Sequence, residues 1–334
     1  MTGLKAFRKT MAVLGFACIF AVGVCWLPAS AYQRWQLLDG TDYETLRWTY
    51  ERIHFDPRPV DIAIVGPSKT LNGLSAARIE QRLSELGEPA NVANFSLVAD
   101  GRNANWAIVS ELYKTKSPKL IIVGIDDAPF PYGHPAFKYF APTSAIVSPP
   151  QPLLHDYFYD LAYLPYRESK LFGAWLFPGL AGLTKTFDPQ DYARTRSDFT
   201  STFTVNGRTL DMDRVIPRNV LLAEAHLPEK PSIAARALSL FNEGDDHVYI
   251  REIARLAKLH GTQLLFVFLP TFNGSKEVDD RAFLEEFGQV LSEGDMAQRD
   301  ELYMNWVHFN HAGAMIASDR LAKAIAGLEA NRGP

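Results

Sequence analysis

The chain has 334 residues, a formal net charge of −4, 47% hydrophobic residues and 22% charged residues. This composition is that of a globular protein and excludes a disordered or fibrous chain. A slightly acidic chain without a long basic run gives no reason to expect nucleic acid as a partner. The length suffices for one large domain or two of ordinary size.

Residues 1–31 are predicted to be a signal or anchor segment rather than part of the fold. Three basic residues, Lys5, Arg8 and Lys9, precede an uncharged and mostly apolar run from Met11 to Leu27. Such a segment directs the chain into the export pathway and leaves its N-terminus in the cytoplasm. We therefore expect the rest of the chain in an extracytoplasmic space, the periplasm.

Two fates of this segment remain open. Residues 29–31, Ala-Ser-Ala, fit a small-x-small cleavage site that would release a soluble protein. The apolar run of about 17 residues is also at the short limit of a membrane-spanning helix, and we favour an uncleaved anchor in the inner membrane. Both cysteines, Cys18 and Cys25, lie in this segment, so the exported domain has neither disulfides nor a catalytic thiol.

Residues 32–334 are predicted to form an α/β domain, because strands and helices alternate along the chain with short loops. Before the alternation stops, the predicted elements are a helix over 43–51, a strand over 61–65, a helix over 76–86 that Ser75 can cap, a strand over 91–95, a helix over 105–114 and a buried strand over 119–125. A parallel sheet follows from this order.

The region at about 128–231 is predicted to be an insertion or cap. It is rich in proline, glycine and aromatic residues and shows little periodicity, which predicts little regular structure. The alternation then resumes with helices over 232–241 and 248–260, a strand over 263–269, a helix over 279–291 and a last helix over 312–328.

Ser68 stands just beyond the first predicted strand, after Gly66 and Pro67. Ligands of open parallel sheets bind at that edge, and a serine ahead of a helix gains exposed N–H groups that stabilise an oxyanion. A lone Gly-x-Ser more often fills a turn. Together with a second segment, near the C-terminus, we favour the interpretation of Ser68 as a nucleophile.

That segment is Asn305-Trp-Val-His308, about 240 residues downstream of Ser68 and just ahead of the last predicted helix. A histidine beside a serine acts as a general base when a third group fixes its tautomer. Asn310 suits the cap of the helix, which places His311 inside the helix start and makes it the weaker candidate. A lone loop histidine is more often a surface residue, and only the pairing with Ser68 favours His308.

These segments resemble the SGNH (GDSL-like) hydrolase superfamily, and most of all its membrane-anchored exported members that act in alginate O-acetylation and teichoic-acid D-alanylation. The resemblance covers residues 61–130 and 263–328. It implies a three-layer sandwich with a parallel, flavodoxin-like sheet and a large insertion. It also implies that Ser68 is the nucleophile and that the N–H of Gly101, in the second block over 94–101, lines the oxyanion hole.

The sequence departs from the family pattern at three positions. Pro67 replaces an acidic residue before the serine. Asp126 occupies the place of an oxyanion-binding asparagine, and an ionised carboxylate cannot donate a hydrogen bond. Asn305 replaces the aspartate that orients His308, so the imidazolium would lose its anionic partner. Asp300 is a nearby carboxylate that could substitute for it.

The resemblance implies acyl transfer or deacylation on a cell-envelope or exopolysaccharide through Ser68 and His308, with a membrane-bound O-acyltransferase as partner. The alternative, which Asn305 and Asp126 favour, is a catalytically degenerate protein that binds glycan or acts as a scaffold in a polysaccharide assembly. A plain secreted esterase is a third candidate. No cofactor and no metal site are predicted, because the chain has no glycine-rich phosphate loop and its histidines lack zinc-site spacing.

Two stretches of the insertion carry further candidates. Its aromatic residues could form a platform for sugar rings or a small core of the insertion, and we favour the core; they are Tyr132, Phe137, Tyr139, Phe140, Tyr157, Phe158, Tyr159, Tyr163 and Tyr166. The apolar residues 171–183 are too few to span a bilayer. They suit a buried loop, an interfacial anchor or a docking surface, and burial is favoured.

Overall fold

The structure is a computed structural model, which describes residues 2–126, 132–151, 156–179, 182–193, 198–205, 207–225 and 245–330. Its centre is a five-stranded sheet in the order β2-β1-β3-β6-β7, in which every pair of neighbours is parallel. The strands are β1 (Ile62–Val65), β2 (Val92–Asn94), β3 (Leu120–Ile125), β6 (Gln263–Phe268) and β7 (Gln289–Ser292). The predicted parallel sheet is confirmed.

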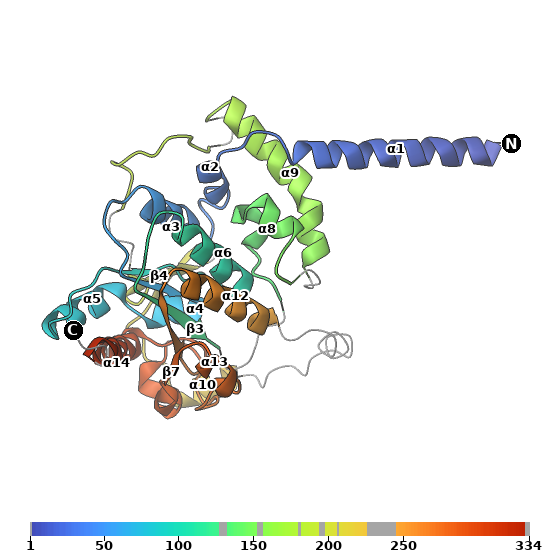
Figure 1. Cartoon of the computed structure of the whole chain (residues 1–334). Coiled ribbons are helices and arrows are strands. Elements are labelled where there is room, and N and C mark those ends of the chain that lie inside the picture. Colours follow the sequence, from blue (N-terminus) through green and yellow to red (C-terminus); the bar gives the residue numbers. More distant parts are fainter. Residues whose placement is uncertain are drawn as a thin grey trace.

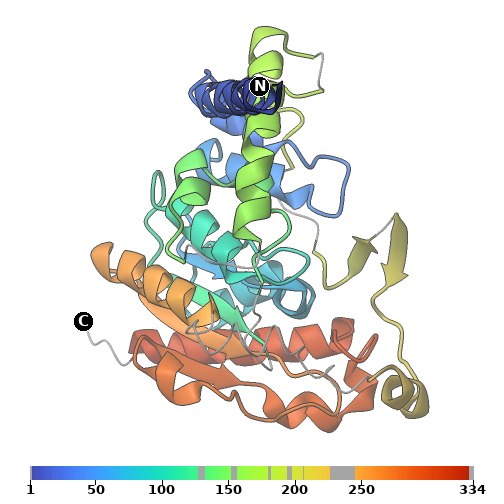
Figure 2. The same cartoon turned by 90° about the vertical axis from the view of Figure 1, so that its right-hand side faces the viewer.

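Alternate residues of each strand pack against helices on opposite faces of the sheet. On one face Ala63 and Val65 share a core with α6 (Arg102–Leu112) and α12 (Asp245–Leu259). On the other face Ile62 and Ile64 share a core with α5 (Ala76–Glu85) and α14 (His311–Ala330). Figure 2 shows α12 and α14 on opposite sides of the strands, so the domain has three layers.

The helix ends follow the predicted caps. The Ser75 side chain accepts a hydrogen bond from the Arg78 N–H at the start of α5. Asn310 Oδ1 accepts one from the Gly313 N–H, at 3.0 Å, at the start of α14. The helix predicted over 43–51 is α3 (Thr45–His54), and the one predicted over 232–241 lies outside the described residues.

The helix predicted over 279–291 is wrong in its second half. Helix α13 (Arg281–Glu285) ends early, and the chain then pairs with β6 as the edge strand β7. A Cβ atom at Gly288 would overlap the Leu264 carbonyl, so the glycine lets the chain approach β6 closely. Pairing with β6 therefore outweighs the local helical pattern.

The expectation of little regular structure in the insertion is also wrong. The described part contains α7 (Phe137–Phe140), α8 (Thr143–Val147), the 20-residue helix α9 (Tyr157–Leu176), a hairpin of β4 (Thr202–Val205) and β5 (Arg208–Asp211), and α10 (Arg218–Glu224). Pro165 lies inside α9. A proline and aromatic residues on several sides of the helix conceal the periodicity that predicts helices.

A buried arginine fixes α9 to the segment before it. Arg167 is fully buried, and its Nη1 donates to the carbonyls of Lys138 and Ala141, both at 2.8 Å. Its Nη2 donates to the Thr143 hydroxyl and pairs with Glu168 at 2.6 Å. Through these hydrogen bonds and this ion pair, the buried guanidinium of Arg167 holds α7, α8 and α9 together.

The nine aromatic residues of the insertion differ in burial, and Tyr139, Tyr157 and Tyr163 are half-buried. Phe137 and Phe140 are buried in the core that α6 shares, so the favoured core interpretation holds for them, although that core is not separate from the main one. Phe158, Tyr159 and Tyr166 are more than half exposed. Within residues 171–183, Leu171, Ala174 and Leu183 are buried, but the favoured burial is wrong for three exposed side chains, Trp175, Leu176 and Phe177.

The N-terminal helix α1 (Thr2–Val24) extends away from the body of the protein beside α9 (Figure 1). No helix in the described ranges is both long enough and apolar enough to cross a membrane. The predicted signal or anchor function of residues 1–31, and the exported location, stay predictions.

Two glycines allow the turn between β1 and α4 (Ser68–Gly73) to pack closely against the sheet. Cβ atoms at Gly66, after β1, and at Gly124, in β3, would each overlap the side chain of Thr70, which is 1% exposed. The absence of these two Cβ atoms lets the first turn of α4 lie directly over the ends of β1 and β3. Ser68 is the first residue of that turn.

We expect Gly124→Ala to lower the free energy of unfolding by about 3 kcal/mol, because the added methyl group meets a fully packed Thr70. Urea denaturation measures the effect. Thr70→Ala removes the side chain that the added methyl group meets and should relieve part of this loss. The double variant should therefore lose less free energy of unfolding than the two single variants added together. Gly327→Ala in α14, where no atom lies within 4 Å of the added Cβ, is the matched control and should not destabilise. Equal losses at positions 124 and 327 would contradict the packing argument.

Candidate active site

Ser68 lies at the C-terminal edge of the sheet, where the loops of parallel strands meet. The chain leaves the buried strand β1 at Val65, passes Pro67 in an extended conformation and enters α4 at Ser68, which is partly exposed. The other end of α4 is held by Asn94, whose Nδ2 donates to the carbonyls of Thr70 and Leu74 at 3.3 and 3.0 Å. The serine is therefore fixed from both sides.

A tight loop presents His308 toward this serine. Tyr303 and Phe309 form an isolated antiparallel bridge, and the Met304 N–H donates to the His308 carbonyl at 3.1 Å. The rings of Tyr303 and Phe309 are buried and stack edge to face with centroids 5.0 Å apart. The apolar pair closes the loop, so residues 305–308 have little freedom to move.

Asn305 organises this loop through one oxygen atom. Its Oδ1 accepts hydrogen bonds from the backbone N–H groups of Val307 and His308, at 2.9 and 2.8 Å. The same oxygen lies 3.1 Å from His308 Nδ1. Two backbone donors can be satisfied only by the oxygen of the carboxamide, so the side chain cannot be flipped. Asn305 therefore requires a proton on Nδ1 of His308.

With Nδ1 protonated, Nε2 of His308 is the acceptor. It lies 2.9 Å from Ser68 Oγ, so the serine hydroxyl donates to the imidazole. This is the tautomer in which a histidine can remove a serine proton. The structure thus brings together Ser68, His308 and Asn305 in one chain of hydrogen bonds.

The electrostatic surroundings keep His308 neutral. Burial, with a smaller contribution from the positive charge of Lys69, lowers the pKa of His308 to about 4. A neutral imidazole at pH 7 can accept a proton, but the imidazolium that forms during the reaction lacks an anionic partner. Asn305 supplies orientation without charge.

Asp126 forms an ion pair with a lysine that is next to Ser68 in the chain. Its Oδ1 lies 3.0 Å from Nζ of Lys69, and both side chains are largely buried. Lys69 follows Ser68 directly in the chain, but no sequence pattern singles it out as a site residue. Because the ammonium lies against the carboxylate, it offsets the repulsion that Asp126 would exert on a developing oxyanion.

Further charged residues lie close to this pair. Burial and the negative charge of Asp126 raise the pKa of Asp100 to about 7, while Lys69 and Arg102 oppose the rise. Arg102 is buried, donates to the Gly124 carbonyl at 2.7 Å and pairs with Asp246 at 3.4 Å. Asp100 and Arg102 flank the predicted oxyanion residue Gly101, and this proximity is the sequence signal that could have indicated them.

Gly101 is the N-cap residue of α6, directly before the first helical residue Arg102. Its φ of +138° is disfavoured for residues with a side chain, and a Cβ atom there would overlap the backbone of His134. These two constraints account for a glycine at this position. Among the described contacts, none joins Gly101 to Ser68, so its place in an oxyanion hole stays a prediction.

Two other sequence candidates lie outside the site. Asp300 does not substitute for an aspartate at position 305: its Oδ1 lies 3.3 Å from Arg218 Nη1, and Asn305 already holds the His308 Nδ1. His311 Nδ1 donates to the Thr200 carbonyl at 3.0 Å, and the backbone N–H of His311 donates to the Met212 carbonyl at 2.7 Å. His311 therefore anchors the hairpin of the insertion.

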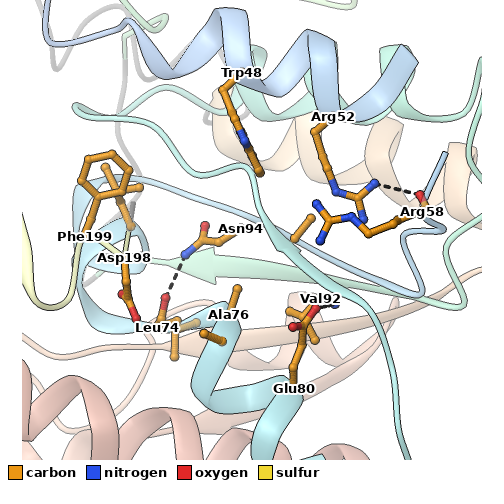
Figure 3. A pocket seen from close by; sticks show the side chains of 13 residues that line it. Trp48, Arg52, Arg58, Leu74, Ala76, Glu80, Val92, Asn94, Asp198 and Phe199 are labelled. Carbon is orange, nitrogen blue, oxygen red and sulfur yellow. Dashed lines mark hydrogen bonds between the residues drawn. The ribbon is translucent and has the colours of Figure 1, made fainter. Parts of the chain in front are cut away.

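A separate pocket of about 100 Å³ lies along the edge strand β2, between α3, α5 and Phe199 (Figure 3). Arg52 and Arg58 lie at one side of it and Phe199 at the other, and Trp48 lies beside Arg52 on α3. The arginines already bind protein atoms, since Arg58 pairs with Asp56 at 2.7 Å and Arg52 donates to two carbonyls. Ser68, Asn305 and His308 do not line this pocket.

Within the described ranges, no group of three histidine, cysteine or acidic residues could hold a metal ion. No protein-family model matches the sequence, and no curated protein matches it.

We expect Asn305→Asp to raise the pKa of His308, because a carboxylate in place of the carboxamide favours the imidazolium. Asn305→Ala should instead remove the acceptor from two backbone N–H groups and lower stability by about 1–3 kcal/mol. NMR of the ring nitrogens as a function of pH measures the first effect, with the buried His134 as the internal reference. An unchanged titration of His308 in Asn305→Asp would show that Asn305 does not govern the imidazole.

Proposed function

We propose that this protein is an extracytoplasmic serine-dependent O-acyltransferase or esterase of the SGNH type, acting on a cell-envelope or exopolysaccharide. The observation that carries the proposal is the hydrogen-bonded chain from Ser68 Oγ through His308 to Asn305 Oδ1. The strand order of the central sheet is that of flavodoxin-like folds, and Ser68 follows β1 at the point where that order reverses.

The reaction would begin with proton transfer from Ser68 Oγ to His308 Nε2, as Oγ attacks the carbonyl carbon of an ester. Collapse of the tetrahedral intermediate breaks the ester bond, and the imidazolium gives its proton to the leaving oxygen. The acyl group then resides on Ser68. A sugar hydroxyl or water, deprotonated by His308, attacks the acyl-serine and regenerates the enzyme.

Backbone N–H groups at the start of α4, together with that of Gly101, are the proposed oxyanion donors. The first N–H groups of a helix have no partner within it and point toward its N-terminal side, where Ser68 lies. The ammonium of Lys69 adds positive charge in the same region, since it also lowers the pKa of His308. It therefore favours negative charge that develops on a substrate at Ser68.

The setting of the reaction is part of the proposal. Residues 1–31 would keep the domain at the inner membrane, facing the periplasm, and a membrane-bound O-acyltransferase would deliver the acyl group. The basic flank and apolar run of the N-terminal segment support export. If the segment is cleaved after Ala31, the soluble product fits the esterase form of the same chemistry.

A non-catalytic function is the second candidate. The neutral Asn305 and a His308 pKa of about 4 both weaken the site as an acid–base catalyst. The pocket beside β2 is lined by the aromatic side chains of Trp48 and Phe199 and by several polar side chains, and an aromatic and polar lining of this kind supports a binding function. In that case the fold would serve to bind glycan or to act as a scaffold in a polysaccharide assembly.

A fluorophosphonate probe, which phosphonylates activated serines, tests the catalytic proposal. We expect the full chain to be labelled, and both Ser68→Ala and His308→Ala to lose labelling at least 100-fold, because the nucleophile and its base act as a unit. His311→Ala is the matched control, since its side chain binds Thr200 and not the serine. Absence of labelling in folded wild-type protein would favour the glycan-binding function.

The pH dependence of labelling should follow the protonation of His308. The neutral imidazole is the base, so the rate should be constant above about pH 5 and fall as pH drops through the His308 pKa of about 4. In Asn305→Asp the acidic limb should move to higher pH, because the pKa rises. Labelling rates between pH 3.5 and 8, corrected for the folded fraction by circular dichroism, measure both profiles. Identical limbs in the two proteins would contradict the assignment of His308 as the base.

A further inference from the structure

The C-terminal end of α9 carries an apolar surface that the protein does not cover. Trp175, Leu176 and Phe177 are 38%, 45% and 62% exposed. On the side of these turns that faces the protein, Leu171 and Ala174 are buried against Leu183 and Leu37. Since that side is already packed, the helix cannot rotate to bury the three exposed side chains. We call residues 175–179 the α9 tip.

The α9 tip lies where α1 leaves the body of the protein. Gln33 in α2 (Ala31–Trp35) donates to the Ala174 carbonyl at 3.1 Å. The side chain of Gln36 donates to the Thr184 carbonyl at 3.0 Å and accepts a hydrogen bond from the Thr184 N–H at 2.9 Å. Helices α1 and α9 are in contact, and Figures 1 and 2 show α1 departing beside α9. Trp26, between α1 and α2, is 84% exposed. Trp26 and the α9 tip are therefore two exposed apolar surfaces near the place where α1 and α2 contact α9.

Helix α1 indicates what covers these surfaces. Seven of its large apolar side chains are at least half exposed and are spread around the helix: Phe7, Met11, Val13, Phe16, Ile19, Phe20 and Val22. A helix that is apolar on all sides is stable only in apolar surroundings. A lipid phase that surrounds α1 would also reach the α9 tip, whereas a protein groove that fits one face of α1 would not.

Positive charge borders the tip. Lys170 and Lys185 are exposed, and the Nζ atom of Lys185 lies 4.7 Å from the centre of the Trp175 ring. Lys5, Arg8 and Lys9 add basic residues to α1. Tryptophan and lysine together are the residues that proteins place at the boundary between lipid tails and headgroups. The charge complements anionic headgroups.

We propose that the α9 tip and the α1–α2 junction, residues 22–27, together bind the surface of an anionic lipid bilayer. The contact fixes the orientation of the domain relative to the membrane, because two segments that are distant in the sequence both touch it. It concerns a surface that shares no residue with the candidate active site and does not rest on the acyl-transfer proposal.

A fluorescent probe at a single cysteine tests the contact in the full chain. In a Cys18→Ser and Cys25→Ser background, Phe177→Cys places an environment-sensitive dye at the tip. Phe158→Cys, at the other end of α9 and 69% exposed, is the matched control. With vesicles of phosphatidylcholine and phosphatidylglycerol, the dye at 177 should shift its emission to the blue. Nitroxide-labelled lipids should quench it at least threefold more than the dye at 158.

Three results would overturn the proposal. In the first, the dye at 177 stays as accessible to aqueous iodide as the dye at 158. In the second, nitroxide-labelled lipids quench the dyes at both positions equally. In the third, the dye at 177 gives the same emission shift and quenching in purely zwitterionic vesicles as in anionic ones. A protein partner in place of lipid would give the first of these, since the vesicles hold no other protein. Lys185→Glu should reduce quenching at 177 only where the lipid is anionic. Ser68→Ala should leave every signal unchanged, which separates this test from that of the active site.

Discussion

The candidate active site depends on how closely the first turn of α4 packs against the sheet. Thr70 lies between two positions, Gly66 and Gly124, where a single added carbon atom would overlap its side chain. This contact fixes the turn on the ends of β1 and β3, and Asn94 fixes its far end. A serine at the first position of such a turn has a defined direction before any partner reaches it. Pre-set geometry of this kind lets a histidine 240 residues away meet Ser68 at hydrogen-bond distance.

Asn305 separates two tasks that an aspartate performs together. An aspartate both orients the histidine and stabilises its positive charge. In this protein the orientation is secured by geometry, because two backbone N–H groups direct the carboxamide oxygen toward Nδ1. An asparagine free to rotate could turn its amide NH2 group toward His308 and so favour the tautomer with the proton on Nε2. The two backbone N–H groups that bind Oδ1 prevent this rotation. What the site lacks is charge, which bears on the rate of a reaction and not on the alignment of its groups.

The sequence predicts the parts of this structure that depend on local patterns. A buried strand followed by Gly-Pro-Ser, and a histidine just ahead of a capped helix, are visible without coordinates, and so are Ser75 and Asn310 as caps. Strand β7 is not, because its conformation follows from pairing with β6 and from the room that Gly288 leaves. Helix α9 is hidden by Pro165, and its position depends on the buried Arg167. Lys69 is invisible as a site residue because its role depends on Asp126, 57 residues further along the chain.

The charges of the site form a set in which no member can be judged alone. Taken by itself, Asp126 would repel an oxyanion, and Lys69 would oppose the protonation of His308. As an ion pair at 3.0 Å, each reduces the effect of the other. An asparagine at position 126 would leave the buried ammonium of Lys69 beside His308 without that partner, and the imidazolium would be still less favourable. Asp126, which in the sequence suggests an inactive site, therefore partly neutralises Lys69, the cation directly after the nucleophile Ser68. The cost of accepting a proton on His308 is set by this balance together with Asn305, and not by either replacement alone.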